Sequence, residues 1–280
     1  MTPTVTLTLN LVGAGHVGRV LGRLFAASGA FALQDVLTRS EASAQAAVDF
    51  IGAGHACTDV ALMRSAPVWM LAVSDDQIES ASALLAQTHD LTGAVVFHCS
   101  GAKASAALQA LRARGALVAS VHPIRSFADP ERVASEFAGT FCGVEGDAAA
   151  LAVLHPAFEA IGARLVPIDG AAKTVYHAAA VFASNYLTTV LDCALRAYQA
   201  AGIPEAVARE LAQPLASETL ANVFRLGAAT ALSGPVARGD VATVARQEQA
   251  LLDWDDATGR LYGALVPLTA DLARRKHGGA

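Results

Sequence analysis

"VTLTLNLVGAGHVGRVLGRLFAASGA", residues 5–30, runs from an apolar strand, expected to start by about Thr4, through the pattern G-x-G-x-x-G into a helix. In this order of elements the first glycine makes a tight turn, the second lets a pyrophosphate approach the backbone, and the third lets helix and strand pack closely. The start of the helix then offers free N–H groups and its positive dipole end to the phosphates. The stretch predicts a dinucleotide-binding turn formed by Gly13, Ala14, Gly15, His16, Val17 and Gly18.

The second expected strand, "FALQDVLTRSE", indicates which dinucleotide binds. An NAD site usually has an acidic residue at the end of this strand, but here the end reads Thr38, Arg39 and Ser40. A guanidinium can pair with a 2′-phosphate through two hydrogen bonds, and the neighbouring hydroxyls can donate to the same group. Asp35 lies too early in the strand to replace the missing acid. We therefore expect NADP, the alternative being a solvated Arg39 beside a serine that caps the next helix.

Further apolar strands alternate with alanine-rich helical segments through the first part of the chain. Because such strands are buried on both faces, the pattern predicts a doubly wound α/β fold with a mainly parallel sheet. The expected strands are residues 67–73, 93–101, 116–123, 140–146 and 163–169.

Ligands of such sheets bind outside the carboxyl ends of the strands. This rule places Val73, Ser74 and Ser100 near the cofactor. It also selects His98 and His122 as groups that could bind substrate, because histidine exchanges protons near neutral pH. The alternative for each histidine is a hydrogen-bonded side chain at a strand end.

The pattern changes after Asp169, because no further strand follows. The rest of the chain predicts an all-helical domain, so we expect a dinucleotide-binding domain at residues 1–169 and a helical substrate and dimerisation domain at 170–280. The expected helices span residues 171–200, 204–227, 240–253 and 255–275.

The first of these helices carries "KTVYHAAAVFASNYL", residues 173–187. At about 100° per residue, Lys173, His177 and Asn185 fit one broad face of the helix. The helix begins where the sheet domain ends, next to an expected interdomain cleft, and such clefts are preferred ligand sites. We therefore predict a catalytic role for these three residues. The alternatives are a solvated Lys173, a His177 satisfied in the core, and an Asn185 bonded to another helix.

A second candidate segment is "SGPVARGD", residues 233–240. Asp240 is placed to cap the following helix, and Arg238 could instead pair with a substrate carboxylate.

Composition excludes several classes of protein. The 280 residues are 54% hydrophobic with a net charge of −5 and no basic run, so the chain lacks the footprint of a nucleic-acid binder. Its four cysteines have neither the spacing of a metal site nor the density of a disulfide scaffold. There is no secretory pattern at the amino terminus, and no uninterrupted apolar run of the roughly 20 residues that a membrane span requires. We expect a cytoplasmic protein that binds neither metal, membrane nor nucleic acid.

The motifs "GAGHVG", "FHCSG", "SVHPIRSF", "KTVYHAAAVFASNYL" and "ALSGPVARGD" together resemble the Rossmann-like proteins with a DUF2520 carboxy-terminal domain. That group is similar to the two-domain NADP-dependent reductases, among them ketopantoate reductase, pyrroline-5-carboxylate reductase and the F420-dependent NADP oxidoreductases. The resemblance covers nearly the whole chain. It implies a Rossmann domain, a helical domain like that of 6-phosphogluconate dehydrogenase, and a homodimer formed through the helical domain.

The hydroxy-acid dehydrogenases of this superfamily carry a catalytic lysine on the helix, with an asparagine four residues later. Lys173 matches the lysine, but the position four residues on is His177, so the resemblance implies no particular substrate. We expect an oxidoreductase that transfers a hydride between NADP and a small carbonyl, imine or hydroxy compound. A protein that binds NADPH without chemistry, as a sensor, is the alternative. A decarboxylating or opine-type dehydrogenase would use the same site.

Overall fold

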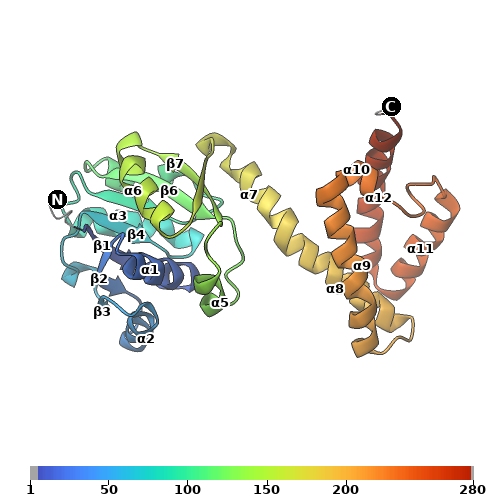
Figure 1. Cartoon of the computed structure of the whole chain (residues 1–280), viewed down its shortest axis with the longest axis horizontal. Helices are drawn as coiled ribbons and strands as arrows, with labels where there is room; N and C mark the ends of the chain where they lie inside the picture. The colour runs from blue at the N-terminus through green and yellow to red at the C-terminus, as the bar shows by residue number, and fades with distance from the viewer. Residues whose placement is uncertain (1–5, 279–280) are drawn as a thin grey trace. The chain divides into compact units, whose positions relative to one another are not determined.

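The computed structural model describes residues 6–278, so the expected strand start at Thr4 lies outside the described residues. Contacts divide the chain into two compact units, Met1–Phe182 and Ala183–Ala280, which we call the sheet unit and the helical unit (Figure 1). The division falls later than the predicted boundary after residue 169. The reason is that the first turns of the long helix, from Lys173 to Phe182, belong by their contacts to the sheet unit.

The sheet unit contains one eight-stranded sheet in the order β3-β2-β1-β4-β5-β6-β7-β8. Neighbouring strands are parallel except β6 and β7, which are antiparallel, so the prediction of a mainly parallel sheet is confirmed. The sequence analysis missed β3, because it has only three residues. The strands are β1 (Thr8–Val12), β2 (Ala32–Leu37), β3 (His55–Cys57), β4 (Val68–Leu71), β5 (Val95–His98), β6 (Leu117–Pro123), β7 (Phe141–Gly146) and β8 (Arg164–Pro167).

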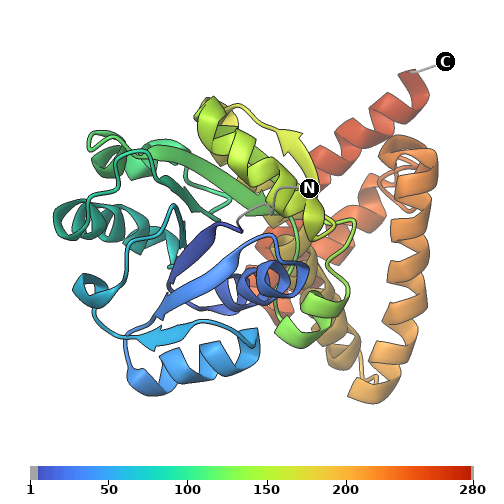
Figure 2. The same cartoon turned by 60° about the vertical axis from the view of Figure 1, so that its left-hand side comes forward.

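Helices cover both faces of this sheet (Figures 1 and 2). The helices are α1 (His16–Ser28), α2 (Glu41–Ile51), α5 (Pro130–Ser135) and α6 (Ala148–Ala160) on one face, and α3 (Ile78–Thr88) and α4 (Gln109–Arg112) on the other. Short 3₁₀ segments lie at Val60–Leu62, Asp75–Gln77, Ser105–Leu108 and Gly170–Ala172.

Alternating side chains of β1 show how the two cores form. Leu9 and Leu11 face the α1 side, whereas Val12 faces the α3 side. On the α1 side Phe158 packs edge-to-face against Phe25 and Phe97, with ring centroids 5.2 and 5.8 Å away. Burying each such ring contributes roughly 1.5–3 kcal/mol, so the aromatic cluster fixes α1 and α6 on the sheet.

The helical unit continues from a π-helical turn at Phe182–Tyr186. Helices α11 (Val241–Trp254) and α12 (Asp256–Gly278) pack closely in this unit, because a Cβ on Gly259 would lie 2.6 Å from the Leu252 nitrogen. The remaining helices are α7 (Lys173–Val181), which precedes the π turn, α8 (Leu187–Ala200), α9 (Glu205–Leu226) and α10 (Ala228–Ala231).

One helix of the described chain, Gly170–Ala200, is long and apolar enough to cross a membrane by length and composition alone. This property is weak support for a span, since core helices of other proteins share it. The first turn of this helix also places the ammonium group of Lys173 among buried polar groups of the sheet unit. That attachment argues against placing the segment in lipid.

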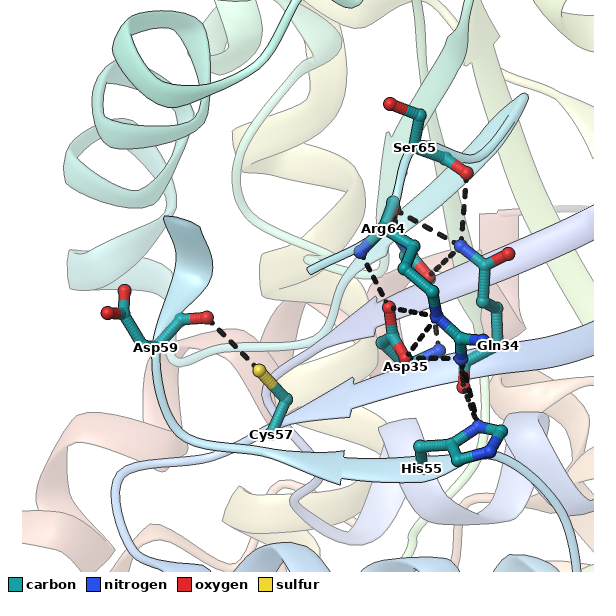
Figure 3. Close-up of polar contacts among 8 residues, drawn as sticks. Gln34, Asp35, His55, Cys57, Asp59, Arg64 and Ser65 are labelled. Atoms are coloured by element: carbon teal, nitrogen blue, oxygen red, sulfur yellow. Dashed lines mark hydrogen bonds and ion pairs between the residues drawn. The ribbon is translucent and has the colours of Figure 1, made fainter. Parts of the chain in front are cut away.

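A polar network ties β1, β2 and β3 to the loop that precedes β4 (Figure 3). Asp35, 5% exposed, accepts from the Arg64 guanidinium at 2.6 Å and from the Arg64 backbone N–H at 2.7 Å. The guanidinium also contacts His55 Nδ1 at 2.9 Å, and the Gln34 amide donates to the Ser65 carbonyl at 3.0 Å. Figure 3 shows the Arg64 side chain lying between Asp35 and His55.

The network explains why Asp35 does not act as the acid of an NAD site. Burial favours a raised pKa for this carboxyl, but the hydrogen bonds and charge of Arg64 outweigh burial and hold the pKa below its usual value. Asp35 is therefore an ionised structural group whose oxygens already have donors. It is not directed toward a ribose.

We expect Asp35→Ala to lower the free energy of unfolding of the sheet unit by about 2 kcal/mol, because it removes several hydrogen bonds to a charged group. Urea denaturation, followed by fluorescence of the buried Trp69 in a Trp254→Phe background, measures this unit alone. Asp49→Ala removes an exposed carboxylate bonded to Gln45 and serves as the control. Equal effects of the two substitutions would contradict a structural role for the Asp35–Arg64 pair.

Candidate functional site

The glycine turn lies at the carboxyl end of β1, and each glycine has its own physical reason. Gly13 has φ +84°, and a Cβ there would lie 2.8 Å from the Ala72 carbonyl oxygen. A Cβ on Gly18 would lie 2.7 Å from the Gly13 carbonyl oxygen, so only glycine allows helix α1 to pack this closely. Gly15 has no protein atom near its missing side chain. Its backbone is therefore open to a ligand.

Helix α1 begins at this turn without a side-chain cap. Gly15 is the N-cap residue, and the first turn contains no acidic residue. Its early N–H groups and positive dipole end therefore have no acidic side chain from the helix's own first turn beside them. The next residue, His16, bonds through Nδ1 to the Phe127 carbonyl oxygen at 2.7 Å, so its ring is committed to a loop contact.

A cavity of about 820 Å³ extends from the glycine turn along the ends of β2 and β4. Seven of the predicted cofactor residues line it: Gly13, Ala14, Gly15, Thr38, Arg39, Val73 and Ser74. Five predicted residues are not among those that line it: His16, Val17, Gly18, Ser40 and Ser100. The cavity also includes residues that the sequence analysis did not select, chiefly Ser43, Asp76, Gln77 and Ser80.

The end of β2 separates into a structural part and an open part. Ser40 caps helix α2 by accepting from the Ser43 N–H at 3.3 Å, and the hydroxyls of Thr38 and Ser43 lie 2.6 Å apart. Arg39 is exposed and makes no hydrogen bond or ion pair with any residue that the structure describes. Its guanidinium is the cation at this end of the cavity that has no partner in the described chain.

The side chains of two predicted strand-end residues, His98 and Ser100, already form hydrogen bonds within the protein. His98 is fully buried, with Nε2 3.1 Å from the Ala104 carbonyl oxygen and Nδ1 accepting from the Ser100 N–H at 3.2 Å. Burial, and secondarily the charge of Lys173, lowers its pKa to about 4. The Ser100 hydroxyl accepts from the N–H groups of Ala102 and Lys103. These contacts shape the loop after β5 and leave neither side chain free for a ligand.

Three aromatic side chains gather over the same loop, one from β6 and two from α7. The His122 Nδ1 atom lies 2.8 Å from the Tyr176 hydroxyl, and the ring of His177 lies 5.7 Å from that of His122. Gly101 lies beneath both imidazoles, since a Cβ there would collide with His177 Nδ1 and lie 2.7 Å from His122 Nε2. The Nδ1 atom of His177 is buried and has no hydrogen-bond partner among the described residues.

The protonation of this cluster follows from its surroundings. Burial lowers the pKa of His122 to about 4, with additional effects of His177 and Lys173, whereas Asp75 acts to raise it. Burial also raises the pKa of Tyr176 to about 12. At neutral pH His122 is therefore an uncharged imidazole beside a protonated phenol. Such a pair can donate hydrogen bonds without carrying charge.

Lys173 lies below this cluster, inside the sheet unit. Its side chain is 1% exposed, and its Nζ donates to the Ser120 hydroxyl and lies 3.3 Å from Glu145 Oε1. Glu145 also accepts from the Ser105 N–H and hydroxyl, both at 2.7 Å. Burial lowers the pKa of Lys173, while Glu145 opposes the change. In this structure the ammonium group faces protein atoms, and its acidic partner, Glu145, was not predicted from the sequence.

Asn185 and Arg238 belong to the helical unit. Asn185 lies in the π turn, where its carbonyl oxygen accepts from the Thr189 hydroxyl at 3.2 Å. Arg238 is exposed and borders a cavity of about 580 Å³ formed by residues of the helical unit. Asp240 accepts from the Thr243 N–H at 3.0 Å, which confirms the predicted cap of α11.

The sequence analysis missed Tyr176, although it lies between two residues that were selected. Its signal was the sequence "VYHA", in which a phenol precedes His177 on one turn of a helix. Glu145, a largely buried acid in an otherwise apolar strand segment, was not predicted either. A charged residue in the middle of such a strand needs a buried partner, and this requirement could have linked it to Lys173.

Two protein-family models match consecutive parts of the chain. Residues 3–123 match the family model of the Rossmann-like domain, and residues 140–269 match that of a domain of unknown function, DUF2520. No curated protein matches the sequence.

Several solved structures share the fold over almost the whole chain. A protein from Thermotoga maritima is 26% identical, with 96% of this chain and 100% of that chain covered and a TM-score of 0.72. An imine reductase from Myxococcus stipitatus in complex with NADP+ is 19% identical, with 97% and 96% covered and a TM-score of 0.62. A pyrroline-5-carboxylate reductase from Coxiella burnetii is 14% identical, with 97% and 98% covered and a TM-score of 0.59. Together with the family matches, these findings confirm the predicted architecture: a Rossmann-like match over residues 3–123 is followed by a DUF2520 match over residues 140–269.

Proposed function

We propose that this protein is an NADP-dependent oxidoreductase that transfers a hydride between the cofactor and a small carbonyl, imine or hydroxy compound. The observation that carries the proposal is the unpartnered guanidinium of Arg39, which borders the same 820 Å³ cavity as the open backbone of Gly15. The nearest acid on β2, Asp35, is already bound by Arg64. This end of the cavity therefore suits a phosphate better than a ribose hydroxyl.

The residues of the cavity fit such a cofactor. Gly13 and Gly15 would leave room for the pyrophosphate at the start of α1, and Arg39 would pair with the 2′-phosphate, with Thr38 beside it. Val73 and Ser74, at the end of β4, would contact the part of the cofactor that extends from the pyrophosphate toward β5 and β6. When bound, a nicotinamide cofactor supplies or accepts the hydride.

The residues that handle the substrate are proposed to lie over Gly101. Strands β4, β5 and β6 are adjacent, so their carboxyl ends form one edge that leads from Ser74 to Gly101 and then to His122. Neighbouring strands are about 4.8 Å apart, so His122 lies within the length of a dinucleotide from the glycine turn. His122 would hydrogen-bond the reacting oxygen or nitrogen, and His177 would exchange a proton beside it.

Lys173 is proposed to act on the substrate through His122. Because its ammonium group is 1% exposed and held by Ser120 and Glu145, it contributes a fixed charge beneath the cluster. That charge disfavours protonation of His122. A direct catalytic contact of Lys173 with the substrate, the catalytic role of Asn185 and the substrate contact of Arg238 stay predictions.

Several further observations support this proposal. The imine reductase and the pyrroline-5-carboxylate reductase named above are reductases with the same fold, and the former binds NADP+. The four cysteines are free thiols, as expected of a protein in the reducing cytoplasm.

In the helical unit, α9 exposes Leu211, Leu215 and Phe224, the last at 86%. Apolar side chains in this number favour the predicted homodimer through that unit.

We expect Arg39→Ala to weaken NADPH binding by about 30-fold, since a charge-assisted pair with phosphate contributes about 2 kcal/mol, and to leave NADH binding unchanged. Titration of the purified protein with each nucleotide, followed by nicotinamide fluorescence, measures both affinities. Arg114→Ala, which removes an exposed arginine of the turn after α4, is the control. Failure of the wild-type protein to bind either nucleotide would contradict the proposed function.

Gly15 and Gly18 are expected to respond in opposite ways to substitution by alanine. Gly15→Ala adds a methyl group that meets no protein atom, so stability is retained while NADPH affinity falls at least about tenfold. Gly18→Ala forces a methyl group against the Gly13 carbonyl oxygen and costs about 1–3 kcal/mol of stability. Urea denaturation and NADPH titration of both variants separate the two effects. An unchanged affinity in Gly15→Ala would place the pyrophosphate elsewhere.

We expect Lys173→Met to raise the pKa of His122 from about 4 toward the ordinary value of 6.5, because loss of a nearby positive charge favours the imidazolium. The pH titration of the His122 ring, followed by nuclear magnetic resonance of [¹⁵N]histidine-labelled protein, measures this shift. Lys103→Met removes a lysine that is paired with Glu79 near the surface and should leave the His122 titration unchanged. If both variants titrate like the wild type, Lys173 does not act through His122.

A further inference from the structure

Tyr176 is the one member of the histidine cluster without an assigned role. Its hydroxyl lies 2.8 Å from His122 Nδ1, and its ring meets the His122 ring edge-to-face, with centroids 5.6 Å apart and planes at 86°. It is carried by α7, the helix that also carries Lys173 and His177. The buried contact of Lys173 with Glu145 thus holds α7, and with it Tyr176, in place over β6 and β7.

The strand beside β6 leaves a space for this hydroxyl. Gly143 pairs with His122 in the antiparallel ladder of β6 and β7. A Cβ on Gly143 would collide with the Tyr176 hydroxyl oxygen and lie 2.8 Å from Cζ. Gly143 has no left-handed φ, so its lack of a side chain is explained by the tyrosine rather than by backbone geometry.

The direction of the hydrogen bond follows from the donors around the phenol. The Gly143 backbone interacts with the Tyr176 oxygen and acts to lower its pKa, which is the effect of an N–H donor. The phenolic hydrogen itself then needs an acceptor, and among the described residues His122 Nδ1 is the one within hydrogen-bond distance. This arrangement favours Tyr176 as the donor and Nδ1 as the acceptor, and an accepting Nδ1 carries no hydrogen.

A neutral imidazole carries its single hydrogen on the other nitrogen. The charged and titratable groups that act on His122 are Lys173 and His177 from α7 and Asp75 from the segment after β4, and together with burial they keep the ring uncharged at neutral pH. Its hydrogen is consequently on Nε2. That atom has no hydrogen-bond partner among the described residues, and it lies 2.7 Å from the place that a Cβ on Gly101 would occupy.

We propose that Tyr176 is a positioning residue that locks His122 in the Nε2–H tautomer, so that His122 presents a neutral hydrogen-bond donor over Gly101. The matching ligand atom is an uncharged acceptor with a lone pair, namely a carbonyl oxygen or an unprotonated imine nitrogen. The use of this donor in turnover rests on the proposed function. The tautomer itself does not.

The test is the tautomer of His122 in the full-length [¹⁵N]histidine-labelled protein, observed by proton–nitrogen correlation of the ring at neutral pH. Loss of signals in His122→Gln assigns the ring. In the wild type we expect a protonated Nε2 and an unprotonated Nδ1. In Tyr176→Phe, which keeps the aromatic ring, we expect the two nitrogen shifts to move toward each other as both tautomers become populated.

Two further variants make the result specific. Gly143→Ala should reproduce the change by displacing the hydroxyl without removing it. Tyr262→Phe removes a hydroxyl that donates to Gln247 in the helical unit and should leave His122 unchanged. A protonated Nδ1 in the wild type, or an unaltered His122 in Tyr176→Phe, overturns the proposal. Failure of the wild-type protein to bind NADPH would instead overturn the proposed function. The two failures are distinguishable, because the tautomer is measured without nucleotide.

Discussion

The buried ion pair between Lys173 and Glu145 is the contact on which the arrangement of the candidate site depends. Taking both charges out of water is costly, so the pair persists only because Ser120 and Ser105 complete its hydrogen bonds. Removing one partner of such a pair typically costs about 3–5 kcal/mol. The pair therefore holds the first turn of α7 on strands β6 and β7. Tyr176 and His177 follow one turn later, directly over the end of β6.

Glycines make this placement sterically feasible on both sides of the cluster. Gly101 leaves space beneath the two imidazoles, and Gly143 leaves space for the phenol. At the other end of the same sheet edge, Gly13 and Gly18 bring α1 close to β1 while Gly15 stays open. Glycines thus make room at two places along one edge of the sheet. The first place holds the rings of His122, Tyr176 and His177, and the second is proposed to hold the cofactor phosphates.

Charge is distributed along this edge in a way that suits the two proposed tasks. The cavity beside the glycine turn ends at an exposed cation, Arg39, and the nearest acid on β2, Asp35, is bound by Arg64 instead. The cluster over Gly101 is kept uncharged by burial and by the positive charge of Lys173. A cationic end binds a charged ligand group, whereas a neutral imidazole and phenol bind a polar group without requiring it to be charged.

The sequence by itself determined the alternation of strands and helices along the chain apart from the short β3, the glycine turn and the cap at Asp240, because these depend on residues close together in the chain. It also identified Lys173, His177 and His122 as candidates. Tertiary structure alone decided their roles: Lys173 is buried because Glu145, 28 residues away, accepts it, and His98 is satisfied by its own loop. The partner of His122 is Tyr176, 54 residues later. Such contacts depend on strand order and on the antiparallel register of β6 and β7, which no local pattern specifies.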